Sequence, residues 1–508
     1  MHSKHTFKLL IAILFFAGCA SDRPRSFVAG IDAQTRQSRV EDAQAQRVKG
    51  HPSIRFDAAL LDTLDASLAE PDLKQARKLS DALLTNAHDL AMRCASNEML
   101  RLSDEAWSSV VTDYFGLSMP IDAEIRGRLA DEVRRGSDVE FWLLQQQIAN
   151  AKDIASLRII LADLRKNTET SAKVAGRGGR QATGILFAPA AAAIRDSIHD
   201  DEATCQGDGR FAGVTRYVLS SDATDLSISN GDLLARYAPV FLQETLENPP
   251  YNASADRLGT VVASDRGDID VDTTKPSIYG YTRTVLLSGE AHVQLTYVLW
   301  YPEHPALKFG IDAEAGHIDG ATVRITFDSE NKPALYETLN NCGCHHRLYP
   351  SEALEEAARK AFGETDKGKT YVIERDAEEY DVIIPGLLRT QDGDRAFVRC
   401  LAGTHAVVNV TFAAEKPNEP VVATEQYQLR NYDELERLAT PGGRIVSMFE
   451  PNGLVRGAER FEGKIFNSLG MLSAGQPRQR GTQLIQWDAY DFDDPHLYEK
   501  IIRLPKHF

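Results

Sequence analysis

The sequence lacks the patterns that would assign it a common hydrolytic activity. Neither Gly-x-Ser-x-Gly, the nucleophile elbow of serine hydrolases, nor His-Glu-x-x-His, the zinc-protease pattern, occurs in its 508 residues. Positive charge is scarce, because 57 Lys and Arg stand against 73 Asp and Glu, which gives a net charge of −16. Such a chain repels a phosphate backbone on average, so we expect no nucleic-acid partner.

Long apolar runs are also missing, and the run near the start, residues 9–16, is too short to remain as a membrane-spanning helix. Basic residues Lys4 and Lys8 flank its beginning, and the small residues Ala17 and Gly18 lead directly to Cys19. This order predicts a cleaved signal peptide over residues 1–18. An ordinary secretory signal with a chance cysteine is the alternative interpretation.

The same residues resemble bacterial lipoprotein signals, although Phe16 stands where that class usually has Leu. The resemblance implies that Cys19 carries the lipid and becomes the mature N-terminus, so that the protein contacts a membrane through its anchor. Ser21, rather than an aspartate, stands shortly after this cysteine, which in that class implies the outer membrane. We therefore expect a cell-envelope protein, with another envelope protein as a candidate partner.

Cysteine is sparse, with six residues in the chain. Five of them follow Cys19: Cys94, Cys205, Cys342, Cys344 and Cys400. An exported chain can form disulfides. Because five is an odd number, at least one thiol is free, metal-bound or paired with another chain.

Hydrophobic patterns predict an α+β protein, with an all-α helical domain over residues 51–200 and a β-rich, largely antiparallel domain over 231–508. Within the helical domain, Pro71 is placed to start a second helix, and Gly136-Ser137-Asp138 predicts a helix break. Polar residues 19–50 are expected to form a lipid-anchored tether. Residues 201–230 are expected to form a linker.

Histidines, cysteines and carboxylates concentrate between residues 292 and 346. Alternation over residues 291–301 predicts a strand with His292 on a half-exposed face. Pro302 and Pro305 predict that this strand ends in a loop holding Glu303 and His304.

A second loop is predicted over residues 311–320, where Glu314, His317 and Asp319 lie among glycines. His304, His317 and Asp319 are candidate metal ligands. Glu303 and Glu314 are candidate bases toward a metal-bound water.

The sharpest local pattern is Cys342-Gly343-Cys344-His345-His346. Thiolate and imidazole groups suit zinc, so Cys342, Cys344 and His345 join the candidate ligands. A disulfide, within the pair or to Cys400, and a nucleophilic thiol with a histidine base are the alternatives.

The order of Tyr237-Ala238-Pro239-Val240, Trp300-Tyr301-Pro302 and Gly316-His317-Ile318-Asp319 resembles landmarks of vacuolar-sorting-type and necrosis-inducing-like β-sandwich domains over residues 231–346. Necrosis-inducing proteins bind a divalent cation through a Gly-His-Arg-His-Asp-Trp-Glu motif. The resemblance implies a cation at His317 and Asp319. Gly320 and Ala321 replace the family's Trp-Glu, which speaks against both its metal binding and its membrane-directed activity.

The sequence thus favours an exported, membrane-anchored lipoprotein with a non-catalytic binding or structural role in the envelope. A metal-dependent hydrolase, with zinc held by a His/Asp/Cys centre in residues 292–346, is the alternative.

Overall fold

A computed structural model of the chain divides into two compact units, Met1–Thr170 and Ser171–Phe508. It describes residues 22–115, 122–168, 210–221, 231–306, 315–343, 345–375, 382–389, 395–412, 420–451, 453–458, 460, 497–506 and 508. The predicted signal peptide, Cys19, Cys205, Glu314 and Cys344 lie outside these residues. No helix in the described ranges has the length and apolar character needed to cross a membrane.

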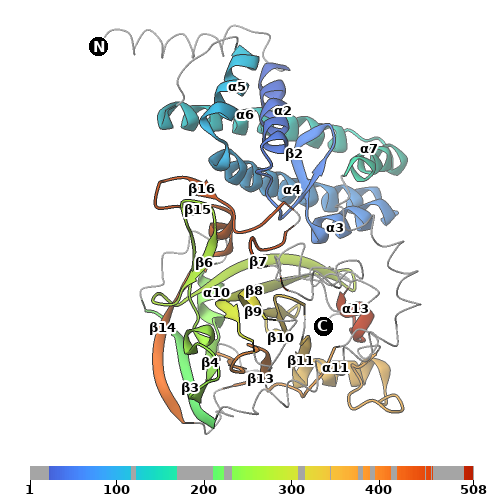
Figure 1. Cartoon of the computed structure of the whole chain (residues 1–508). Coiled ribbons are helices and arrows are strands. Elements are labelled where there is room, and N and C mark those ends of the chain that lie inside the picture. The colour runs from blue at the N-terminus through green and yellow to red at the C-terminus, as the bar shows by residue number, and fades with distance from the viewer. Residues whose placement is uncertain are drawn as a thin grey trace, which may run out of the picture. The chain divides into compact units, whose positions relative to one another are not determined.

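The first unit is a group of helices around a small β-hairpin (Figure 1). Its elements are α2 (Asp22–Gln37), β1 (Gln46–Val48), β2 (His51–Phe56), α3 (Ala58–Ala69), α4 (Leu73–Arg101), α5 (Asp104–Phe115), α6 (Ala123–Ala149) and α7 (Ile154–Asn167). Four helices begin after an aspartate whose carboxylate accepts a backbone N–H: Asp57, Asp72, Asp122 and Asp153. These caps define the helix starts more sharply than Pro71 does, since Pro71 lies just before Asp72.

Two predictions for this unit are wrong. Residues 19–50 are not simply a tether, because α2 and β1 fall within them, and Phe27 and Ile31 of α2 are buried in a hydrophobic cluster. The predicted helical character of the unit is confirmed, and β1 and β2 add a short antiparallel hairpin to it. The predicted helix break at Gly136 does not occur, because α6 continues through this residue. A glycine inside a helix costs about 1 kcal/mol of stability. Burial of the side of α6 that carries Gly136 and Ser137 offsets this cost.

The second unit is built on a ten-stranded mixed sheet in the order β11-β10-β9-β8-β7-β14-β3-β4-β12-β13. Its strands are β3 (Arg210–Leu219), β4 (Val240–Glu247), β7 (Ser277–Leu287), β8 (Glu290–His304), β9 (Gly316–Phe327), β10 (Pro333–Asn340), β11 (Arg347–Pro350), β12 (Phe397–Cys400), β13 (Val407–Thr411) and β14 (Val421–Asn431). Neighbours are mostly antiparallel; the parallel pairs are β7 with β14, β14 with β3, and β4 with β12. The predicted α+β class with a largely antiparallel sheet is confirmed.

Shorter elements complete this unit. They are α10 (Gly231–Tyr237), η1 (Ala253–Asp256), β5 (Thr260–Ala263), β6 (Ile269–Asp272), α11 (Glu352–Phe362), η4 (Tyr432–Glu436), β15 (Leu438–Ala439), β16 (Ile445–Val446) and α13 (Leu497–Ile501). One hydrophobic core contains side chains from both ends of the sheet, and the ring of Tyr336 on β10 contacts Phe412, just after β13, at 5.5 Å between centroids. The sheet is therefore curled around this core.

The predicted linker over residues 201–230 is wrong in part, because β3 lies within it and pairs with both β4 and β14. The predicted end of the strand at Pro302 is also wrong. β8 continues to His304, and beyond Leu299 it pairs with β9 but no longer with β7. Pro302 can therefore turn its missing N–H toward the unpaired side of the strand.

Candidate functional site

The paired ends of β8 and β9 place the predicted site residues. Tyr301 lies opposite Asp319, Glu303 opposite His317, and His304 opposite Gly316. His317 and Asp319 therefore belong to a strand, not to the predicted loop. The prediction of a loop over residues 311–320 is therefore wrong from Gly316 onward, where β9 begins.

Asp319 is fully buried and has a cationic partner on each carboxylate oxygen. Arg460 Nη2 donates to Oδ1 at 2.5 Å, and His405 Nδ1 lies 2.7 Å from Oδ2. Burial alone would raise the pKa of Asp319, but the charge of Arg460 and the hydrogen bond from His405 hold that pKa far below its usual range. Asp319 is thus a permanent carboxylate already neutralised by protein groups.

His405 lies between two carboxylates. Its Nδ1 donates to Asp319, and its Nε2 lies 3.3 Å from Oδ1 of Asp256 in an ion pair. Its ring stacks on Tyr301, with centroids 3.8 Å apart and planes within 6°. Burial would lower the pKa of His405, but Asp256 and Asp319 outweigh it and raise the pKa to about 9. At neutral pH this imidazole is therefore charged and cannot accept a proton as a base.

Asp256 completes what we call the ion cluster: Asp256, Asp319, His405 and Arg460. Its Oδ1 accepts the Gly403 N–H at 2.6 Å, and its Oδ2 accepts the Tyr251 hydroxyl at 2.8 Å. Two carboxylates thus face one imidazolium and one guanidinium. Formal charges balance inside the fold, as buried ion pairs require.

The backbone beside the cluster is under local constraint. Ile318 has φ of +58° and His405 has φ of +54°, a region that side chains other than glycine rarely adopt. Gly316 is required for space, since a Cβ there would lie 2.9 Å from Cγ of Arg460. Conformations like that of Ile318 cost about 1–3 kcal/mol, so the contacts of the ion cluster must offset them.

The other candidate metal ligands do not form one ligand set with Asp319. His304 is buried, with its ring centroid 6.3 Å from that of His405. His317 is exposed, and its Nε2 lies 2.8 Å from the Ile269 carbonyl oxygen. Within the described residues no three His, Cys, Asp or Glu side chains are placed to hold a metal ion.

The Cys342 to His346 segment contributes to a different network. His346 Nε2 lies 2.6 Å from Oε1 of the fully buried Glu337, while Cys342 is buried and His345 has φ of +56°. Cys400 is an unbridged thiol, and burial raises its pKa to about 12. The disulfide to Cys400, one of the alternatives for this segment, is therefore contradicted.

Glu337 is the centre of this second network, on the face of the sheet opposite the core. Arg324 Nε donates to its Oε2 at 2.5 Å, and the Tyr498 hydroxyl donates to the same oxygen at 2.8 Å. Burial would raise the pKa of Glu337, but Arg324 and His346 lower it. His292, expected at a half-exposed face, is instead buried here and stacks on Phe508.

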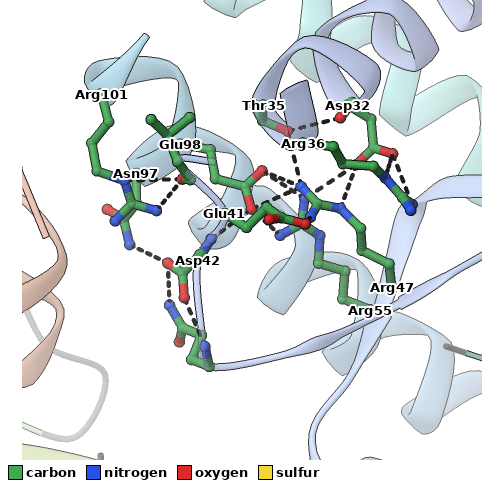
Figure 2. A network of polar contacts seen from close by, with 12 residues as sticks. Asp32, Thr35, Arg36, Glu41, Asp42, Arg47, Arg55, Asn97, Glu98 and Arg101 are labelled. Atoms are coloured by element: carbon green, nitrogen blue, oxygen red, sulfur yellow. Dashed lines mark hydrogen bonds and ion pairs between the residues drawn. The ribbon is translucent and has the colours of Figure 1, made fainter. Parts of the chain in front are cut away.

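A third network lies in the first unit and joins α2, the hairpin and α4 (Figure 2). Glu98 on α4 accepts hydrogen bonds from both Arg47 and Arg55 at 2.7–3.0 Å, and Arg47 Nε also donates to Asp32 at 2.7 Å. Burial would raise the pKa of Glu98, but Arg55 and Arg47 lower it to about 2.

Sequence reasoning missed Asp256, His405, Arg460 and Glu337. His405 lies 86 residues from Asp319 and Arg460 lies 141 residues from it, so no local spacing links them. Glu337 offered a signal, since it interrupts an apolar strand at a position where burial demands a cationic partner.

Comparisons of the chain with protein families, curated proteins and solved structures find no match. The resemblances to lipoprotein signals and to necrosis-inducing-like domains therefore stay predictions.

Proposed function

We propose that this chain is an exported, lipid-anchored envelope protein whose β-rich unit has a non-catalytic binding or structural role. The anchor rests on the residues before Cys19. The non-catalytic role rests on one observation, that both carboxylate oxygens of Asp319 are already held by Arg460 and His405. A metal ion at this position would need a carboxylate oxygen that is not already paired with a protein cation.

Metal-assisted hydrolysis is disfavoured by the same bonds. To bind zinc, Asp319 would have to release a buried guanidinium or imidazolium, and breaking a buried pair costs about 3–5 kcal/mol. His317 would also have to leave the Ile269 carbonyl. The donor atoms present therefore fit ion pairing better than a zinc site, which needs four converging ligands at about 2.0–2.3 Å.

Lipid attachment is tested by labelling cells with an alkyne-bearing fatty acid and fractionating their membranes. We expect the full chain to carry the label and to sediment with the outer membrane, and the Cys19→Ser variant to lose both. Ser21→Ala is the matched control and keeps both. An unlabelled wild-type chain in the soluble fraction would contradict the anchor.

Metal binding is tested on the purified full chain by metal analysis after exposure to zinc. We expect less than stoichiometric zinc and no difference between wild type, His317→Ala and Cys342→Ser. One zinc per chain that is lost in either variant would favour the hydrolase alternative.

A further inference from the structure

Among the residues that the structure describes, the first half of β14 has a neighbouring strand on one side only. β14 pairs with β3 from Val421 to Tyr427, whereas it pairs with β7 only from Gln428 to Asn431. Side chains 421–424 and Gln426 are exposed, and Glu425 is partly exposed. This stretch, residues 421–426, we call the open edge.

Backbone hydrogen bonds show which way the open edge points. Ser220 N–H donates to the Tyr427 carbonyl on the β3 side, and Gln428 N–H donates to the Pro276 carbonyl on the β7 side. N–H and C=O groups alternate between the two sides along a strand. Those of Thr424 and Gln426 therefore point to the β7 side, where β7 begins only opposite Gln428.

Apolar side chains accompany these exposed polar groups. Val421 and Val422 are 49% and 48% exposed. Proteins usually protect sheet edges with charges or proline. The one charged residue of the open edge is Glu425, whose carboxylate forms an ion pair with Arg257 at 3.3 Å.

The unpaired backbone groups of the open edge favour an extended chain as the ligand. A helix satisfies its own N–H and C=O groups and cannot complete a β-ladder. A second copy fits less well, because six paired residues bury far less than the roughly 800 Å² per partner of a stable interface. A net charge of −16 also opposes self-association.

We propose that residues 421–426 bind an extended peptide segment of a partner protein by strand addition. Backbone groups of Thr424 and Gln426 pair with the peptide, and apolar side chains of the peptide pack on Val421 and Val422. This inference rests on the proposed binding role and names the class of partner that the β-rich unit binds.

The test uses a displayed library of random peptides selected on the full chain. The affinity of the selected peptides is then measured for the Thr424→Pro variant, which lacks one outward N–H, and for the Thr424→Val variant, which keeps it. Proline is tolerated on an edge when its missing N–H faces outward. Val422→Lys is a second variant that leaves the backbone intact and protects the edge with charge.

We expect selected peptides to bind about tenfold more weakly to Thr424→Pro and to Val422→Lys, and equally well to Thr424→Val. Hydrogen exchange at Thr424 and Gln426 should slow when peptide is bound. Three results would each overturn the proposal. They are peptides that bind Thr424→Pro as well as wild type, a library that yields no binder, and a wild-type dimer that Val422→Lys dissociates. Fatty-acid labelling and zinc content are measured separately, so failure of the envelope role is distinguishable from failure of strand addition.

Discussion

Replacing Glu98 with glutamine should destabilise the first unit far more than any surface charge change. Glu98 accepts four hydrogen bonds from Arg47 and Arg55 and a fifth from Asp42 N–H at 2.8 Å. Glutamine keeps the shape but removes the fully buried carboxylate that both guanidinium groups share, and leaves them the partly exposed carboxylates of Asp32 and Glu41. Removing one member of a buried ion pair costs about 3–5 kcal/mol.

The pKa of Glu98 gives a second route to this magnitude. A fall from 4.5 to about 2, at about 1.4 kcal/mol per pH unit, corresponds to about 3 kcal/mol. Because the folded pKa is depressed, this stability is fully present above about pH 4.5 and is lost as the pH falls toward 2. Wild type should therefore lose stability in that window, and Glu98→Gln should lose less.

Hydrogen exchange at the amides of α4, followed by mass spectrometry, measures opening of the first unit separately from the second. Glu41→Gln is the matched control, because Glu41 is partly exposed and bonds Arg47 Nη1 at 2.9 Å. We expect the Glu41→Gln variant to lose at most about 1 kcal/mol of stability. The reasoning would be refuted if Glu98→Gln cost no more than Glu41→Gln.

Two further variants test the other networks. Tyr498→Phe removes the hydroxyl that donates to Glu337, and hydrogen exchange in β10 should show a loss of about 1–3 kcal/mol; an unchanged exchange rate would mean that α13 contributes nothing there. His405, with a pKa raised from 6.5 to about 9, contributes stability that is fully present below about pH 6.5 and is lost as the pH rises through 9. Denaturation of the second unit should show this loss in wild type but not in His405→Gln, and equal pH profiles would contradict it.

Local patterns predicted part of the fold well. The strand predicted over residues 291–301 lies within β8, because the alternation that defines a strand acts over a few residues. The helix α2 was missed although Phe27 and Ile31 have helical spacing, since polar residues surround them.

The candidate site could be predicted only in part. Asp319 was predicted as a metal ligand, but the partners that it has in the structure come from segments that the fold brings together over long sequence distances. Spacing could not show that His405 and Arg460 occupy the carboxylate that a metal would need. Clustering of histidines along the chain therefore did not establish that they converge in space.

The charge state of His405 is the most direct test of the account. Nitrogen NMR of the full chain labelled at histidine, with His405→Gln to assign the signal, reports whether each ring nitrogen carries a proton. We predict an imidazolium at neutral pH that titrates near pH 9 and does not change when zinc is added. A neutral ring that titrates near 6.5, or a signal shifted by one equivalent of zinc, would contradict the claim that Asp319 belongs to an ion cluster.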